Sequence, residues 1–204
     1  MLTKNSTIFI VTVIAYSIIV LRNFFIAIVT STIIEVLYLT NQRMFKGGLR
    51  LLNKGIVFDF KGALIPLSTS VVIALSVFHN LDYMFMAFLI SLAMALSSLN
   101  TVITKNLFAV NVLGYVLIYF MLSSILCGNL IFYPYILPLA TQLGIIIGSD
   151  LLHGIYFLDQ LKSKVLIVGG AGEYDAIYVS TIAIQWLEIF RTTLITFICR
   201  TRFV

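Results

Sequence analysis

Long stretches of this chain contain neither an acidic nor a basic residue, and this feature constrains its fold more than any other. Several such runs extend over 17 or more residues. An α-helix rises about 1.5 Å per residue, so about 20 residues cross a hydrocarbon core of about 30 Å. Because lipid offers the backbone no hydrogen-bond partner, a crossing segment satisfies its own amides as a helix. The runs therefore predict several membrane-spanning helices.

The composition supports the same conclusion. Hydrophobic residues make up 61% of the chain and charged residues only 10%, whereas soluble domains carry about 25% charged residues. The net charge of +5 does not indicate nucleic acid, because the bases lie near the ends of apolar runs, as topology signals do. We therefore expect a multi-pass protein of the cell membrane, whose partner is the lipid bilayer and which binds no nucleic acid.

The apolar runs divide the chain into six or seven spans. Residues 6–39 form either one long tilted helix or a hairpin of two short spans, because Arg22 and Glu35 interrupt them. The remaining expected spans cover residues 62–78, 83–103, 107–126, 130–149 and 176–199. The prediction is an all-α, polytopic transmembrane helix bundle. It forms a single domain over residues 1–204, with residues 1–47 as an N-terminal anchor region.

The most polar segment is residues 40–61. Within it, residues 51–57 predict a short β-hairpin about an Asn-Lys-Gly turn, in the region of residues 50–60. Its many lysines and arginines place this segment in the cytoplasm by the positive-inside rule. Arg200 and Arg202 then fall on the outer side. Either the C-terminal tail breaks the rule, or residues 163–174 re-enter the membrane; a polar connection over 153–164 precedes a strand-like stretch at 165–168.

Two aspartates stand at the ends of apolar spans, where a charge is costly. Asp150 follows the span 130–149, and Asp175 opens the last span. Ionisable groups in such positions need a physical reason. One helix reaches the cytoplasmic side at Asp150 and the next leaves it at Asp175. We therefore expect the two carboxylates at similar depth on consecutive spans, as a candidate catalytic pair.

Glycine-bearing segments are expected to meet beside these aspartates, because glycine lets two backbones approach closely. They lie at residue 62, at 144–148 and at 169–172. A histidine three residues beyond Asp150 can face the same way, but no third ligand has metal-binding spacing, so we predict no metal and no cofactor. The candidate binding residues are Gly62, Pro66, Gly148, His153, Gly169, Gly170, Gly172 and Tyr174.

Three stretches resemble the signature stretches of a known family. They are VFDFKGALIP at 57–66, LGIIIGSDLL at 143–152 and VGGAGEYDAI at 168–177. In this order they are similar to the archaeal and bacterial membrane family called domain of unknown function 1614. The resemblance covers about residues 48–190. The family's pattern implies aspartates at positions 150 and 175, and a glycine where this chain has Lys61. It implies no activity.

A second resemblance is to intramembrane aspartyl proteases of the presenilin and signal-peptide-peptidase type. These carry one aspartate in each of two neighbouring spans, the second in a Gly-x-Gly-Asp motif, with a Pro-Ala-Leu motif packed nearby. Here residues 172–175 keep the first glycine and the aspartate but have Tyr174 for the second glycine. Asp150 follows a serine instead of a tyrosine, and residues 63–66 precede the aspartates, whereas the protease motif follows them. The resemblance implies that Asp150 and Asp175 hydrolyse a transmembrane peptide substrate.

Two other roles fit the same residues. In a proton- or cation-coupled transporter of small solutes, the carboxylates would bind the ion and release it on the other face. In a non-catalytic subunit of a membrane complex, Asp150 and Asp175 would only cap helices beside the membrane interface. Elsewhere on the last span, Glu188 and Arg191 are three residues apart and are expected to pair with each other.

Overall fold

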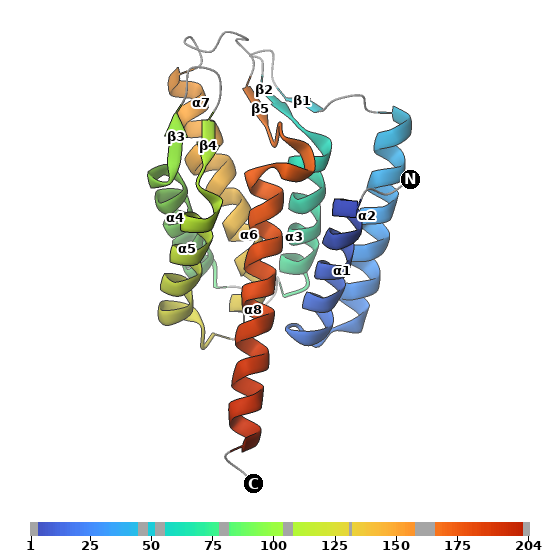
Figure 1. The fold of residues 1–204 in the computed structure, drawn as a ribbon, viewed down its shortest axis with the longest axis vertical. Helices are drawn as coiled ribbons and strands as arrows, with labels where there is room; N and C mark the ends of the chain where they lie inside the picture. Colours follow the sequence, from blue (N-terminus) through green and yellow to red (C-terminus); the bar gives the residue numbers. More distant parts are fainter. Residues whose placement is uncertain are drawn as a thin grey trace.

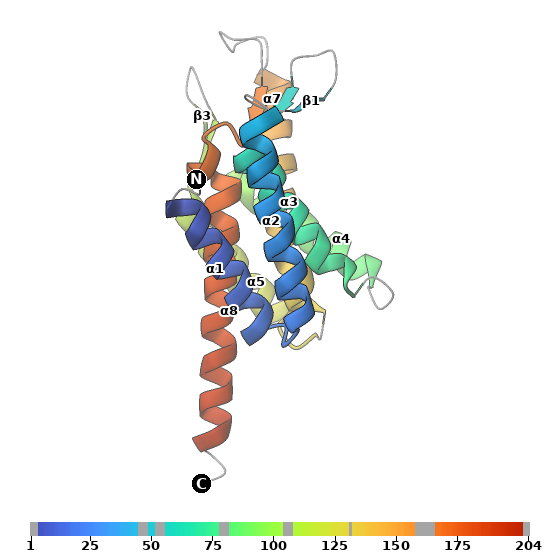
Figure 2. The ribbon, with the colours of Figure 1, turned by 90° about the vertical axis from the view of Figure 1, so that its right-hand side faces the viewer.

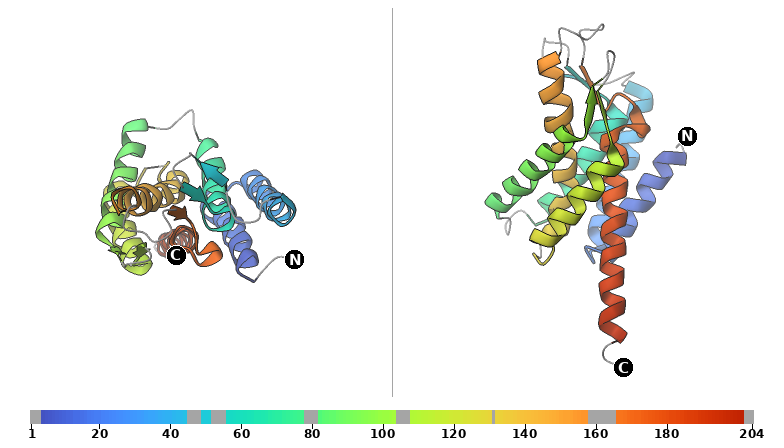
Figure 3. Two further views of the ribbon diagram at one scale, coloured as in Figure 1. Left: turned by 90° about the horizontal axis from the view of Figure 1, so that it is seen from above. Right: turned by 60° about the vertical axis from the view of Figure 1, so that its left-hand side comes forward.

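The computed structural model describes residues 4–44, 49–51, 56–77, 82–103, 108–130, 132–157 and 166–201. The chain is an all-α bundle in which short strands gather at one end (Figure 1). Seen from above, the pair α1 and α2 lies on one side of the bundle and α4 and α5 lie on the other, with α3, α6 and α8 between them (Figure 3).

The N-terminal apolar stretch forms a hairpin. Helix α1 spans Lys4–Ile19 and α2 spans Phe24–Met44. Between them Arg22 takes a positive φ of 51°, and the side chain of Asn23 accepts a hydrogen bond from the Ile26 N–H at 3.1 Å. The polar pair at 22–23 thus makes the turn. Of the two arrangements left open by the sequence, the hairpin is the one observed.

A three-stranded sheet closes one end of the bundle. Strands β1 (Leu49–Leu51) and β2 (Ile56–Phe58) pair antiparallel, which confirms the predicted hairpin, although its turn at 52–55 lies outside the described residues. Strand β5 (Leu166–Val168) pairs with β2 in parallel, so the order is β1-β2-β5. The parallel pairing was not expected, and it places the chain that follows β2 beside the chain that follows β5.

The middle of the chain contains a second strand pair that hydropathy did not predict. A π-helix η1 (Phe60–Leu64) leads into α3 (Ile65–Leu75), and α4 spans Tyr83–Leu99. Strands β3 (Thr101–Ile103) and β4 (Phe108–Val110) then pair antiparallel before α5 (Val112–Cys127). The predicted spans 83–103 and 107–126 are therefore too long at these ends. The β-branched and apolar residues of β3 and β4 lengthen the apolar runs of the sequence, but they form strands and not further helical turns.

The next helix is longer than predicted. Helix α6 (Tyr133–Leu143) continues through the π-helix η3 (Gly144–Leu151) into α7 (Leu152–Phe157). The expected span ended at residue 149 and a polar connection began at 153, so this boundary was wrong, and His153 lies on the helix. Glycines let η3 pack against α4: a Cβ on Gly148 would lie 2.3 Å from the Met94 carbonyl oxygen. The Ser97 hydroxyl donates to the Gly144 carbonyl at 2.6 Å.

Helix α8 spans Ala176–Thr201 and runs past the other helices at the end opposite the strands (Figures 1 and 2). Because β5 lies in the sheet and α8 starts beside it, the described residues 166–174 do not cross the bundle. Arg200 therefore lies at the end opposite β1 and β2, and of the two explanations for the tail, the re-entrant segment is not supported by the described residues.

Several features of the surface suit a lipid environment. The segments Tyr133–Gly154 and Ala176–Cys199 are each long and apolar enough to cross a membrane, and the other apolar helices are shorter. Large apolar side chains stand on the outside of the bundle, which soluble monomers seldom allow over large areas. Among the most exposed are Phe24, Phe25, Met84, Leu113, Ile125 and Phe190.

Two buried apolar clusters hold the elements that carry the aspartates. The larger one joins α4, α5, α6 and α8 and includes Tyr115 and Ile184. A second cluster joins the N-terminal hairpin to η1, α3 and α8 through Phe9, Phe60 and Tyr178. The rings of Phe9 and Tyr178 stack with centroids 4.8 Å apart. The N-terminal hairpin is thus packed against the same helices that lead to the sheet.

Candidate functional site

Two glycines allow the chain after β2 to touch the chain after β5. The Asp59 N–H donates to the Val168 carbonyl at 2.8 Å and extends the strand pairing. A Cβ on Gly62 would lie 2.1 Å from the Gly169 carbonyl oxygen and 2.7 Å from that of Gly172. Gly169 itself has a φ of +75°, a region that glycine adopts without strain. The two segments that resemble family signatures at 57–66 and 168–177 therefore pack backbone to backbone.

Asp175 lies at the end of this glycine loop and caps α8. Its Oδ1 accepts a hydrogen bond from the Ile177 N–H at 3.0 Å, and its Oδ2 accepts one from the Ala171 N–H at 3.4 Å. Burial raises the pKa of Asp175, and the nearby carboxylate of Asp59 raises it further, while the bonds from Ile177 and Ala171 act in the opposite direction. The capping role considered for Asp175 is therefore present in its contacts.

Asp150 reaches the same place from the other helix. It lies in η3 rather than at a helix end, so it does not cap a helix. Its carboxylate is close enough to Asp175 for the two charges to interact, and the backbone N–H of Gly169 lies near it. The structure thus brings together two aspartates from consecutive helices, with Gly62 and Gly169 beside them.

A third carboxylate that the sequence did not single out belongs to the same end of the bundle. Asp59 precedes η1, and its Oδ1 accepts a hydrogen bond from the Gly62 N–H at 2.7 Å. In the sequence, its position directly after a predicted strand was the only indication that Asp59 belongs to this end of the bundle. The pairing of β2 with β5 is what places it near Asp175. Within the described residues, no group of three or more His, Cys, Asp or Glu side chains is arranged to hold a metal ion.

The other candidate binding residues have different surroundings. The Pro66 carbonyl is buried and accepts a hydrogen bond from Gln142 Nε2 at 3.0 Å. Gly148 packs against α4, and the half-buried His153 lies with its Nδ1 3.1 Å from the Ser149 carbonyl oxygen. Gly170 is exposed, and the side chain of Tyr174 is 79% exposed. Of the predicted set, Gly62, Gly169 and Gly172 have the clearest contacts around the aspartate loop.

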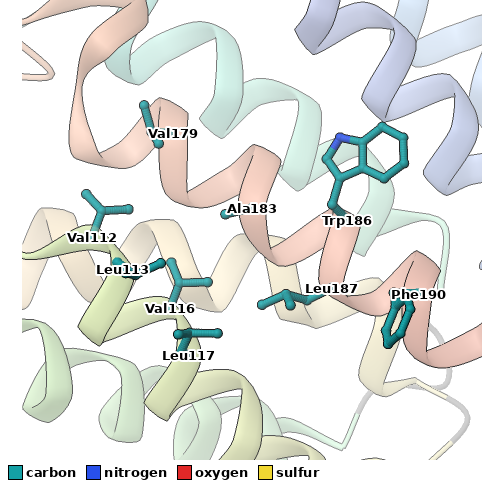
Figure 4. A pocket seen from close by; sticks show the side chains of 9 residues that line it. All are labelled: Val112, Leu113, Val116, Leu117, Val179, Ala183, Trp186, Leu187 and Phe190. Carbon is teal, nitrogen blue, oxygen red and sulfur yellow. The ribbon is translucent and has the colours of Figure 1, made fainter.

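An apolar groove lies on the outer face of the bundle between α5 and α8 (Figure 4). Its volume is about 590 Å³, and its lining residues are Val112, Leu113, Val116, Leu117, Val179, Ala183, Trp186, Leu187 and Phe190. Val179 is one helical turn from Asp175 along α8. The lining has no titratable side chain, so the groove contributes surface for an apolar group but no acid or base.

These observations define a class: an apolar helical bundle in which Asp150 and Asp175 lie near the end where its strands gather. The chain belongs to the family described as "Protein of unknown function (DUF1614)", whose sequence profile matches residues 19–187. No curated protein and no solved structure matches the chain. The comparisons do not extend the likeness to intramembrane aspartyl proteases, and that likeness rests on the residues quoted above.

Proposed function

We propose that this chain is a multi-pass membrane protein of the cell membrane that hydrolyses a peptide bond with Asp150 and Asp175. One observation supports the proposal: Asp150 in η3 and Asp175 before α8 both lie beside the glycine loop at residues 169–172, where their charges interact. Helix capping explains the contacts of Asp175 but gives no reason for a second carboxylate in η3 beside it. Ionisable groups at membrane-facing helix ends are costly and are retained where they act.

The proposed chemistry follows from two carboxyl groups in a water-poor place. Neighbouring carboxylates do not both ionise readily, so the pair shares one proton and titrates as a unit. The ionised aspartate takes a proton from water, whose oxygen attacks the peptide carbonyl carbon. The protonated aspartate gives its proton to the carbonyl oxygen. The first aspartate, which now carries the water proton, gives it to the amide nitrogen. The second aspartate takes a hydroxyl proton from the gem-diol as the C–N bond breaks, which leaves a carboxylic acid and an amine and restores the starting protonation of the pair.

The segment at residues 63–66 supports the same function. In the resembling proteases a Pro-Ala-Leu motif packs near the second aspartate. Here the Ala63 N lies so near Gly169 that a Cβ on that glycine would be 2.7 Å away. Although this segment comes earlier in the chain than expected from those proteases, the pairing of β2 with β5 places it beside the glycine loop.

The substrate we propose is a single membrane-spanning peptide. The aspartates lie at the strand end of a bundle whose outer surface is apolar, so a substrate that enters from lipid meets them near one membrane face. The exposed apolar residues of α5 and α8 are suited to lipid or to an apolar helix. No cofactor is required, since the acid and the base both belong to the chain.

Purified protein in lipid nanodiscs, incubated with a library of single-span peptides, tests the proposal. We expect to detect cleavage products by mass spectrometry. Asp150→Asn and Asp175→Asn should each abolish them completely, because one carboxyl group cannot act as the acid and the base at the same time. Asp82→Asn is the matched control: this aspartate caps α4 at the other end of the bundle and should leave cleavage unchanged. Products that persist in both site variants would contradict the proposal.

A second candidate function is proton- or cation-coupled transport of a small solute. It is favoured by polar side chains inside the bundle along α8, where Gln185 and Glu188 have no exposed surface. Both amide atoms of Gln185 lack a hydrogen-bond partner within the described residues. If no peptide is cut while the protein carries a pH-dependent flux across vesicles that Asp175→Asn abolishes, transport replaces proteolysis. If neither activity is found, the subunit role remains.

A further inference from the structure

A half-buried glutamate ties the loop that carries Asp175 to the rest of the protein. Glu173 lies in the 3-10 helix η5 (Gly172–Tyr174), two residues before Asp175, and its side chain is only 8% exposed. The Lys61 ammonium donates to Glu173 Oε1 at 3.3 Å, and the Ser6 hydroxyl donates to the same oxygen at 2.9 Å. A carboxylate with so little side-chain exposure has lost part of its hydration, and these two partners compensate for the lost water.

Glu173 and its two partners come from three separate parts of the chain. Ser6 is on α1, Lys61 is on η1 and Glu173 is on η5. The family profile begins at residue 19, so Ser6 lies outside the matched region. Lys61 and Glu173 each lie close to a site residue in sequence: Lys61 precedes Gly62, and Glu173 precedes Asp175 by two positions. The contacts therefore join α1 to both segments that form the site.

Tyrosines on α2 and α8 pack beside the ion pair of Lys61 and Glu173. The Lys61 ammonium stands 5.7 Å from the centre of the Tyr38 ring, a cation–π distance. The hydroxyl groups of Tyr38 and Tyr178 are 3.3 Å apart, and Tyr178 donates to the Asn5 carbonyl at 3.0 Å. Both rings belong to the buried apolar cluster of the N-terminal hairpin, so the polar contacts of Glu173 and Lys61 lie next to a packed cluster.

The loop at residues 169–175 is closed by hydrogen bonds between residues three or four positions apart. The Gly172 N–H donates to the Gly169 carbonyl at 2.9 Å, and the Asp175 N–H donates to that of Gly172 at 3.0 Å. Gly169 and Gly172 both have positive φ values, so the loop backbone can adopt many conformations once it is released. An anchor at Glu173 restricts those conformations directly before Asp175.

We propose that Glu173, held by Lys61 and Ser6, is a positioning residue that fixes the loop carrying Asp175, which makes the N-terminal helix α1 part of the site. We call these three residues the Glu173 anchor. Its effect on cleavage rests on the proposed protease function. Its effect on the loop does not.

Charge reversal tests the Glu173 anchor in the full-length protein in nanodiscs. Lys61→Glu and Glu173→Lys each place like charges together, and the double exchange restores an opposite pair. Hydrogen–deuterium exchange at the Gly172 and Asp175 amides should accelerate on the order of tenfold or more in each single variant. It should return toward the original rate in the double exchange. Lys4→Glu, at an exposed lysine at the start of α1, is the matched control and should leave both amides unchanged.

A gentler pair of variants covers the case in which a reversal does not fold. Glu173→Gln keeps the shape and removes the charge, and Ser6→Ala removes one donor, so each should accelerate exchange at the two amides to a smaller extent. Where cleavage is measured, kcat should fall in the single reversals with KM little changed, and the double exchange should recover it. A general loss of stability would not produce that recovery.

The outcomes separate the two proposals. Unchanged exchange in the single variants, or no recovery in the double exchange, overturns the Glu173 anchor. If exchange follows the expected pattern while the unaltered protein cuts no peptide, the Glu173 anchor stands and the protease function fails. If the unaltered protein cuts peptides and the single reversals cut them equally well, Glu173 has no positioning role in catalysis.

Discussion

The α-carbon of Gly62 lies against the carbonyl group of Gly169, so that a Cβ at position 62 would be 2.1 Å from the carbonyl oxygen. This contact between two backbones more than a hundred residues apart allows η1 to lie beside the loop that carries Asp175. Among the described glycines, a Cβ at position 62 would make the shortest contact, and its nearest neighbours are backbone atoms that no side-chain rotation can move.

Gly62→Ala should therefore destabilise the protein by about 1–3 kcal/mol or more, the usual range for overpacking. Thermal unfolding in nanodiscs measures the effect. Gly170→Ala is the matched control, since Gly170 is exposed and a Cβ there would first meet an Ile167 side chain at 3.1 Å. It should cost less than about 0.5 kcal/mol, as surface changes do. Equal losses for the two variants would show that the backbone contact is not the cause.

The raised pKa of Asp175 predicts a pH dependence of stability. Burial is the main cause, and the Asp59 carboxylate adds to it. Since the folded state holds the Asp175 proton more tightly than the unfolded chain does, its contribution is fully present below the ordinary carboxyl range. The contribution is lost as the pH rises through the raised value. The free energy of unfolding should fall over that interval.

Asp175→Asn should flatten this part of the pH profile, because asparagine caps a helix but does not titrate. Chemical unfolding at a series of pH values from acid to neutral gives the slopes. A profile that is equally steep with and without Asp175 would assign the dependence to other groups.

The ion pair on α8 between the buried Glu188 and the half-buried Arg191 predicts a large loss of stability when it is broken. Glu188 has no exposed surface, and Arg191 donates to it from Nε at 2.8 Å and from Nη2 at 2.5 Å, which confirms the pairing expected from their spacing. Arg191 also donates to the Gly128 carbonyl at 3.3 Å, so it ties α8 to the turn after α5. Arg191→Gln leaves the Glu188 carboxylate without its countercharge and should cost about 3–5 kcal/mol.

Replacing both members of this pair with leucine provides the control. Because the double replacement leaves no unpaired charge in the apolar bundle, it should be much less destabilising than Arg191→Gln alone. Urea or thermal unfolding of the three proteins compares them. If the double variant is the least stable, the bonds of the pair, and not the unpaired charge, decide the stability.

Much of the helical architecture could be predicted from the sequence, because the helices of the bundle coincide with apolar runs that hydropathy detects locally. The hairpin about residues 52–55 was predictable for a similar reason, since its turn residues are adjacent. The length of the apolar runs did not predict where the helices end, because Thr101–Ile103 and Phe108–Val110 are strands. Their side chains are as apolar as those of the neighbouring helices, so only strand pairing distinguishes them.

The candidate site was predictable only in part. Asp150, Asp175 and the glycines stood out because charges and glycines are unusual in apolar runs. Asp59 and Glu173 did not stand out, since a carboxylate in a polar segment has an ordinary explanation. Their places depend on the parallel pairing of β2 with β5 and on the contact of α1 with η5, and neither follows from residues that are near in sequence.

The last prediction concerns the orientation of the bundle in the membrane. The base-rich segment 40–61 places the strand end in the cytoplasm by the positive-inside rule, and Asp82 then lies outside, at the opposite end of α4. In intact cells, with Cys127 and Cys199 replaced by serine, a membrane-impermeant maleimide should label Asp82→Cys. It should label Lys54→Cys only after the cells are permeabilised. Because α8 ends on the same side as Asp82, a cysteine in place of Arg200 should also react from outside, although arginine is usually found inside. Labelling of Lys54→Cys in intact cells, with Asp82→Cys protected, would reverse the orientation and place the two aspartates on the outer face.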